Sequence, residues 1–111
     1  MADSKPQTVI CRYVAKPGKE AELETLLRRH WRALHELGLA TDTPAKVYRG
    51  LASEKPGGAH GAARTYVEIF EWKSADAPNV AHQTPAVMAV WEPMGALCED
   101  MDFPHFDPVA L

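Results

Sequence analysis

The spacing of hydrophobic positions changes from a strand-like to a helical period early in the chain. Residues 7–15 are rich in β-branched and aromatic side chains and end at a Lys-Pro-Gly sequence, which predicts a strand followed by a turn. From residue 19 onward the apolar residues recur at helical intervals, and Gly38 supplies a stop. The apolar positions are Leu23, Leu26, Leu27, Trp31, Leu34 and Leu37. This part of the sequence predicts a strand and then an amphipathic helix.

Two further strands are predicted in the middle of the chain, over residues 45–52 and 64–72. The segment between them, residues 54–63, contains one proline and three glycines, and we expect it to be a mobile hairpin loop that can act as a lid.

The last third of the chain predicts helical structure and a final strand. Asp76 and Thr84 are each followed closely by a proline, a pattern typical of helix starts, and Pro93 is expected to kink or restart the second helical stretch. A last strand is predicted over residues 101–109, where two prolines confine it to an edge or shorten it.

The resulting order, β-α-β-β-α-β, predicts an α+β protomer of the ferredoxin-like type, with both helices on one face of a four-stranded antiparallel sheet. The third strand is apolar on both faces, with Val67 and Ile69 on one and Tyr66, Phe70 and Trp72 on the other. Helices can cover only one face, so we expect the second to pack against another copy of the chain in a homodimer.

Composition narrows the class of protein. The 111 residues are expected to form one domain, 1–111, with residues 1–6 as a flexible N-terminus. A net charge of −3 argues against a nucleic-acid partner, and no apolar run approaches the ~20 residues needed to span a membrane. Two cysteines are too few for a disulfide framework, so we expect reduced thiols and a cytoplasmic location.

Two stretches of the chain resemble the antibiotic biosynthesis monooxygenase family. Residues 9–20 (VICRYVAKPGKE), followed by the leucine-rich helix, are similar to the opening of these domains. Residues 68–74 (EIFEWKS), followed by His82 and a helix, are similar to their third strand and second helix. The resemblance covers about residues 8–106, and it implies a dimeric α/β barrel of two ferredoxin-like protomers.

The resemblance carries over to individual site residues only in part. Trp72 matches the tryptophan that ends the third strand of the polyketide monooxygenases, whereas Glu68 stands where those enzymes have an asparagine and Glu92 where they have an arginine. In the haem-degrading branch the first strand carries an asparagine, which is missing here, and the helix positions fall at Ala81 or His82 and near Trp91. Haem degradation is therefore disfavoured.

The third strand offers a candidate pocket wall. Glu68 and Trp72 share a face with Tyr66 and Phe70, which gives three aromatic side chains and one carboxylate. Oxygenation without a cofactor needs a base that deprotonates a phenol or enol in a cavity that excludes water. His82 is the first candidate for the base, because histidine gains and loses a proton near neutral pH, and Glu68 is the second.

The candidate catalytic residues are therefore His82, Trp72 and Glu68, and the candidate substrate-binding residues are Tyr66, Phe70, Arg12 and Trp91. A purely structural interpretation competes with this one: Trp72 anchors the core, Glu68 pairs with Arg12 or Arg49, and His82 packs or caps a helix.

The remaining histidines suggest no metal site. His30 and His35 are five residues apart on the first helix and do not share a face, and His60 falls in the glycine-rich loop. His105 could meet His82 and Glu68, but without a spacing signature we expect neither metal nor cofactor.

Two functions remain open. One is a cofactor-independent monooxygenase acting on a small aromatic or quinol-like compound. The other is a dimeric barrel without catalytic activity that binds a small apolar ligand or serves assembly.

Overall fold

The computed structural model describes residues 5–51 and 62–111. The strands are β1 (Gln7–Ala15), β2 (Lys46–Arg49), β3 (Thr65–Trp72), β4 (Cys98–Asp102) and β5 (His105–Phe106). The helices are α1 (Glu20–Glu36), α2 (Ala77–His82) and α3 (Pro85–Leu97). The expected β-α-β-β-α-β order is confirmed, with the second helical region divided in two and the last strand in two.

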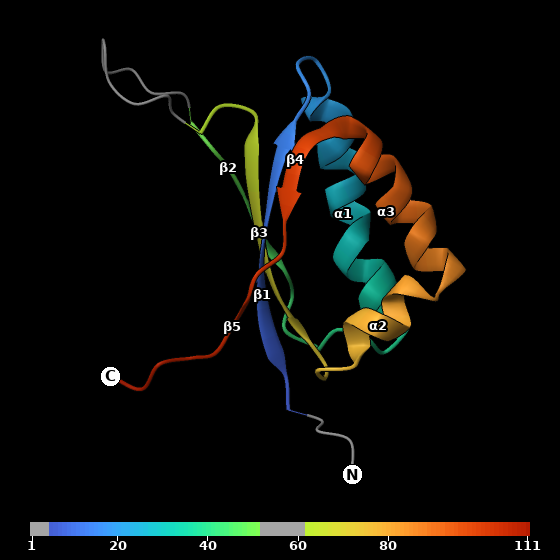
Figure 1. Cartoon of the computed structure of the whole chain (residues 1–111), viewed down its shortest axis with the longest axis vertical. Helices are drawn as coiled ribbons and strands as arrows, with labels where there is room; N and C mark the ends of the chain where they lie inside the picture. Colours follow the sequence, from blue (N-terminus) through green and yellow to red (C-terminus); the bar gives the residue numbers. More distant parts are fainter. Residues whose placement is uncertain (1–4, 52–61) are drawn as a thin grey trace.

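The strands form one antiparallel sheet in the order β2-β3-β1-β4, and β5 continues beside β1 after β4. The helices α1, α2 and α3 lie on the same face of this sheet, and none of the described residues forms a helix on the opposite face (Figure 1). The α+β ferredoxin-like class is therefore confirmed, and β1 occupies the centre where it contacts three other strands.

Alternation along β1 and β3 decides which side chains meet the helices. In β1 every second residue from Val9 is buried, and in β3 every second residue from Tyr66 is buried. The intervening residues are half-buried and lie on the uncovered face, among them Ile10 opposite Ile69 and Arg12 opposite Val67. Both faces of the sheet therefore carry apolar side chains, and helices cover only one of the two faces.

The helices begin and end close to their predicted boundaries. Helix α1 buries Leu23, Leu27, His30 and Leu34 and ends before Gly38, whose φ of 73° is the left-handed conformation that glycine adopts readily. Asp76 and Thr84 precede α2 and α3 as expected, although neither side chain makes a capping hydrogen bond. No helix in the part of the chain described is long and apolar enough to cross a membrane.

Three expectations about boundaries need correction. Helix α3 continues through Pro93, so the expected restart does not occur, although the proline supplies no backbone N–H to the helix. The second strand ends at Arg49, and the last begins at Cys98, directly after α3. Pro104 divides it into β4 and β5, yet its carbonyl oxygen still accepts a hydrogen bond from the Ile10 N–H at 3.1 Å.

Two expectations lie largely outside the described residues. These are the flexible N-terminus, 1–6, of which residues 5–6 are described, and the mobile loop, 54–63, of which residues 62–63 are described.

Candidate functional site

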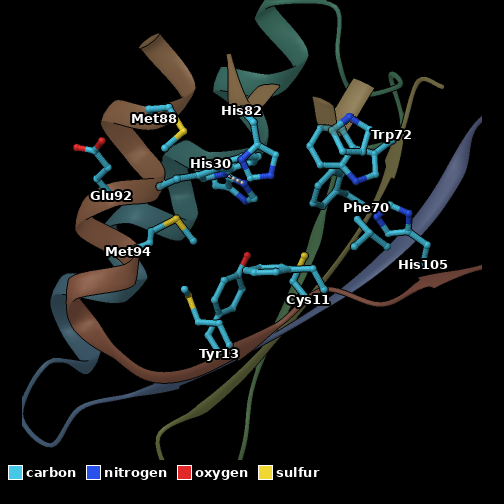
Figure 2. A pocket seen from close by; sticks show the side chains of 15 residues that line it. Cys11, Tyr13, His30, Phe70, Trp72, His82, Met88, Glu92, Met94 and His105 are labelled. Carbon is cyan, nitrogen blue, oxygen red and sulfur yellow. Dashed lines mark hydrogen bonds between the residues drawn. The ribbon is translucent and has the colours of Figure 1, made fainter. Parts of the chain in front are cut away.

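A cavity of about 330 Å³ lies between the sheet and the helices α2 and α3. Most of the side chains that line it are aromatic, aliphatic or methionine side chains, and they come from β1, β3, α1, α2, α3 and the C-terminal strands (Figure 2). The lining residues are Val9, Cys11, Tyr13, His30, Phe70, Trp72, Pro78, His82, Met88, Trp91, Glu92, Met94, Met101, Phe103 and His105. A concave apolar surface with a few polar groups is the usual form of a small-molecule site.

A buried carboxylate lies beside this cavity and is held by two donors. Glu68, on β3, is 0% exposed, and its Oε1 accepts a hydrogen bond from the Tyr13 hydroxyl at 2.8 Å. The same oxygen lies 2.7 Å from Nδ1 of His30, on α1. Both partners line the cavity, whereas Glu68 itself does not. The carboxylate therefore affects the cavity through Tyr13 and His30.

The indole of Trp91, on α3, extends this hydrogen-bonded chain. Its Nε1 donates to Nε2 of His30 at 2.7 Å, so both nitrogens of that imidazole have partners. The Trp91 ring also meets the ring of His82 at 4.7 Å and that of Trp72 at 6.4 Å, both in edge-to-face arrangements. One side chain thus connects the buried histidine with the aromatic lining and with His82 at the exposed end of α2.

Two buried polar atoms near the cavity have no hydrogen-bond partner among the described residues. One is the second oxygen of Glu68, Oε2, and the other is the indole nitrogen of Trp72. A buried donor without a partner costs free energy, which a ligand with a suitable acceptor can recover. Because Trp72 lines the cavity, its N–H can serve an oxygen atom of a bound molecule.

Burial keeps the Tyr13 and Cys11 side chains of the cavity protonated. Loss of hydration raises the pKa of Tyr13 far above its usual value, and the nearby Glu68 carboxylate raises it further. The same two causes, in the same order, raise the pKa of the Cys11 thiol. Neither group is therefore suited to act as a nucleophile or a base at neutral pH.

The structure brings four of the seven predicted site residues to one cavity: Trp72, Phe70, His82 and Trp91. Glu68 lies against the cavity lining and outside the cavity itself. Tyr66 lies on the same face of β3 but donates its hydroxyl to Glu24 of α1, away from the cavity. Arg12 lies on the uncovered face of the sheet, because the alternation of β1 places it opposite to Tyr13 and Cys11.

The structural pairing expected for Glu68 is wrong. Arg12 pairs with Asp100 and Asp102 of β4, and Arg49 pairs with Glu24 of α1. Both arginines are thereby held apart from the buried carboxylate, whose partners are a phenol and an imidazole.

Sequence reasoning missed His30. A signal for it was present, because Leu23, Leu27, His30 and Leu34 follow one another at intervals of four, three and four residues, which places the histidine on the buried stripe of α1. The five-residue separation of His30 and His35, which argued against a metal pair, does not reveal this relation to the leucines.

His82 and His105 line the same cavity, as a shared site would require, but Glu68 is not a lining residue beside them. Within residues 5–51 and 62–111 no group of three or more histidine, cysteine, aspartate or glutamate side chains is arranged to hold a metal ion.

Solved structures similar to this one cover almost the whole chain. SnoaB from Streptomyces nogalater, a cofactor-independent oxygenase, aligns with a TM-score of 0.70 and 19% identity over 96% of this chain and 95% of its own. An antibiotic biosynthesis monooxygenase aligns with a TM-score of 0.68 and 18% identity over 94% and 99%. A protein of Mycobacterium tuberculosis aligns with a TM-score of 0.70 and 16% identity over 96% and 98%.

No protein-family model and no curated protein matches the chain. At these identities the structural similarity establishes the fold and leaves the activity to be argued from the site. It agrees with the resemblance of the first and third strands, so the chain has the fold of the antibiotic biosynthesis monooxygenase proteins.

Proposed function

We propose that this protein is a cofactor-independent monooxygenase that oxidises a small aromatic or quinol-like compound in the cavity between sheet and helices. The observation that supports this proposal is an apolar cavity of about 330 Å³ whose wall includes a histidine hydrogen-bonded to a buried carboxylate. This volume is near the lower end of the ~300–1,000 Å³ range of ligand pockets, which fits a compound of a few fused rings.

The reaction requires only dioxygen as oxidant. A base takes the hydroxyl proton of a phenol, and dioxygen then adds to an electron-rich ring carbon to give a peroxide. Return of the proton to the outer peroxide oxygen, loss of the ring hydrogen as a proton and cleavage of the O–O bond release water. One phenol and one dioxygen thus give one quinone and one water, with one oxygen atom of dioxygen in each product.

The lining residues supply what this chemistry needs from a protein. Trp72 and Phe70 form a flat apolar wall for a ring, and their rings meet edge to face at 5.1 Å. The N–H of Trp72, which has no hydrogen-bond partner among the described residues, can hold a substrate oxygen and so fix the orientation of the ring. Among the imidazoles that line the cavity, the exposed His82 at the end of α2 and the buried His30 on α1 are the two candidates for the base.

A homodimer is part of this proposal. The uncovered face of the sheet carries half-buried Ile10, Val67 and Ile69, together with exposed Tyr48 and Phe106. Within residues 5–51 and 62–111 no helix covers this face (Figure 1), and a second copy presenting the same face would bury it. A stable interface of this kind covers more than ~1,200 Å² in total.

The test is oxygen uptake with a panel of hydroquinones and polycyclic phenols in metal-free buffer, followed by mass spectrometry of products formed under ¹⁸O₂. We expect one labelled oxygen atom in each quinone. Trp72→Phe should raise KM, whereas Trp31→Phe, the same substitution outside the cavity lining, should leave turnover unchanged.

Binding without turnover is the second candidate function, and the predominantly apolar lining of the cavity favours it. Tight binding of phenols with no oxygen uptake on any compound of the panel would support this function and reject the monooxygenase.

A further inference from the structure

We propose that His30, held by Glu68, is the group that accepts the hydroxyl proton of a phenolic ligand, and that the Trp91 N–H occupies this acceptor until the ligand replaces it. The assignment deepens the proposed function and rests on it for the oxidation step, but the proton transfer is testable by binding alone.

The hydrogen bonds fix the proton on the His30 ring. An indole nitrogen can only donate, so the 2.7 Å contact from Trp91 Nε1 requires a bare lone pair on His30 Nε2. A neutral imidazole with a bare Nε2 carries its proton on Nδ1, where the Glu68 carboxylate accepts it at 2.7 Å. The free lone pair of the imidazole therefore belongs to the nitrogen that Trp91 covers.

A buried carboxylate lies 2.7 Å from the other nitrogen of this ring. If a phenol transfers its proton to Nε2, the O–H bond breaks, an N–H bond forms, and the electron pair stays on the ligand oxygen as a phenolate. The imidazolium then faces a carboxylate that is 0% exposed, where an opposite charge interacts far more strongly than in water. Glu68 acts through His30 and is thus a positioning residue.

Trp91 holds the position that a ligand hydroxyl needs. Its nitrogen lies at hydrogen-bond distance from the acceptor, and its half-buried ring packs against the rings of both His82 and Trp72. A ligand O–H that replaces the Trp91 N–H keeps the number of hydrogen bonds at His30 constant, so the exchange leaves no buried acceptor without a partner.

His82 is less suited to the same role. It is exposed, and among the described residues its side chain packs edge to face on Trp91 and makes no hydrogen bond or ion pair. His30 is 3% exposed and has both the carboxylate partner and access to the cavity.

The experiment uses 4-nitrophenol, whose phenolate absorbs visible light, and 4-nitroanisole, the methyl ether that has no proton to transfer. At a pH where free 4-nitrophenol is mostly neutral, we expect the wild-type protein to bind it as the phenolate. His30→Gln, which keeps hydrogen-bonding capacity but cannot hold the proton, should abolish the phenolate band and weaken binding by about 10- to 100-fold. Glu68→Gln should also lower the fraction of 4-nitrophenol that is bound as the phenolate.

Three controls separate this role from a structural one. His82→Gln should leave the phenolate band unchanged, and none of the glutamine variants should affect 4-nitroanisole in the way they affect the phenol. Trp91→Phe should strengthen 4-nitrophenol binding by about fivefold, because the ligand no longer has to break the indole hydrogen bond. A gain of affinity does not arise from damage to the fold, so Trp91→Phe still tests the role of His30 if His30→Gln fails to fold.

The assignment is overturned if the wild-type protein binds 4-nitrophenol as the neutral phenol or not at all, if His82→Gln and not His30→Gln removes the phenolate band, or if Trp91→Phe weakens binding. Phenolate binding without oxygen uptake supports the assignment and rejects the monooxygenase. Oxygen uptake that is unchanged in His30→Gln supports the monooxygenase and rejects the assignment of the proton to His30.

Discussion

Replacing Tyr13 by phenylalanine removes one hydroxyl from the hydrogen-bonded group around Glu68 and leaves the ring in place. The ring continues to pack edge to face on Phe103 at 5.7 Å, so the substitution opens no cavity. What is lost is one of two donors to a carboxylate oxygen in a residue that is 0% exposed. The other oxygen, Oε2, already has no partner among the described residues.

The expected cost follows from this geometry. A hydrogen bond to a charged group contributes about 1.5–3 kcal/mol, and Glu68 is left with His30 alone. For a domain whose total stability is about 5–15 kcal/mol this is a large fraction. With an m-value of about 2 kcal/mol per molar urea, the unfolding midpoint should fall by about 1 M.

The assay is urea unfolding at a fixed protein concentration, because association of two copies makes apparent stability depend on concentration. Tyr48→Phe is the matched control, since its side chain is 54% exposed, and it should change stability by less than about 0.5 kcal/mol. A double-mutant cycle with Glu68→Gln should give a coupling energy between about 0.5 and 3 kcal/mol. Equal stability of Tyr13→Phe and the wild type, or strictly additive costs in the cycle, would refute the reasoning.

Three further predictions concern the thiols, alkaline pH and the uncovered face. Cys11 and Cys98 should not react with a thiol reagent in the native state at neutral pH and should do so after unfolding, because burial raises the pKa of both. The free energy of unfolding should fall as pH rises above about 9, and more steeply above about 10, because the unfolded chain releases the protons that Cys11 and Tyr13 retain when folded. Each of the two groups should contribute a fall of about 1.4 kcal/mol per pH unit. The free energy of unfolding of Tyr13→Phe, measured against pH, should show a shallower slope above about pH 10. In sedimentation, Ile69→Lys should convert a dimer into a monomer of 12.2 kDa, because it places a charge in the proposed interface. Arg29→Glu, on the exposed side of α1, should sediment as the wild type does. A wild-type protein that is monomeric at micromolar concentration would contradict the dimer.

The fold was predictable because each element carries its own local signal. The alternation in β1 and β3, the apolar stripe of α1 and the prolines after Asp76 and Thr84 all appear in short windows of sequence. The errors fall where a local signal conflicts with tertiary pairing. The strand after α3 begins at Cys98 because pairing with β1 starts there, although its sequence, CEDMD, has no typical strand composition.

The candidate site was predictable only as far as strand alternation and the order of elements allow. Trp72, Phe70 and His82 could be placed because a strand end and the following helix meet at one corner of the fold. The partners of Glu68 come from residues 55 and 38 positions away in the chain, on β1 and α1. A contact of that kind depends on register and on helix packing, which no short window of sequence contains.

By the sequence resemblance, Glu68 stands where the polyketide monooxygenases have an asparagine, and the contacts of Glu68 give this difference a physical reason. A buried amide is neutral and can serve a ligand directly, whereas a buried carboxylate needs donors of its own before it is tolerated. Here Tyr13 and His30 provide these donors. The cavity is therefore lined by the His30 imidazole on α1, and not by the side chain of the strand residue Glu68. In the proposed binding mode the side chain that meets the ligand is an imidazole with a lone pair, not an amide, so the cavity would select a molecule that carries an acidic hydroxyl.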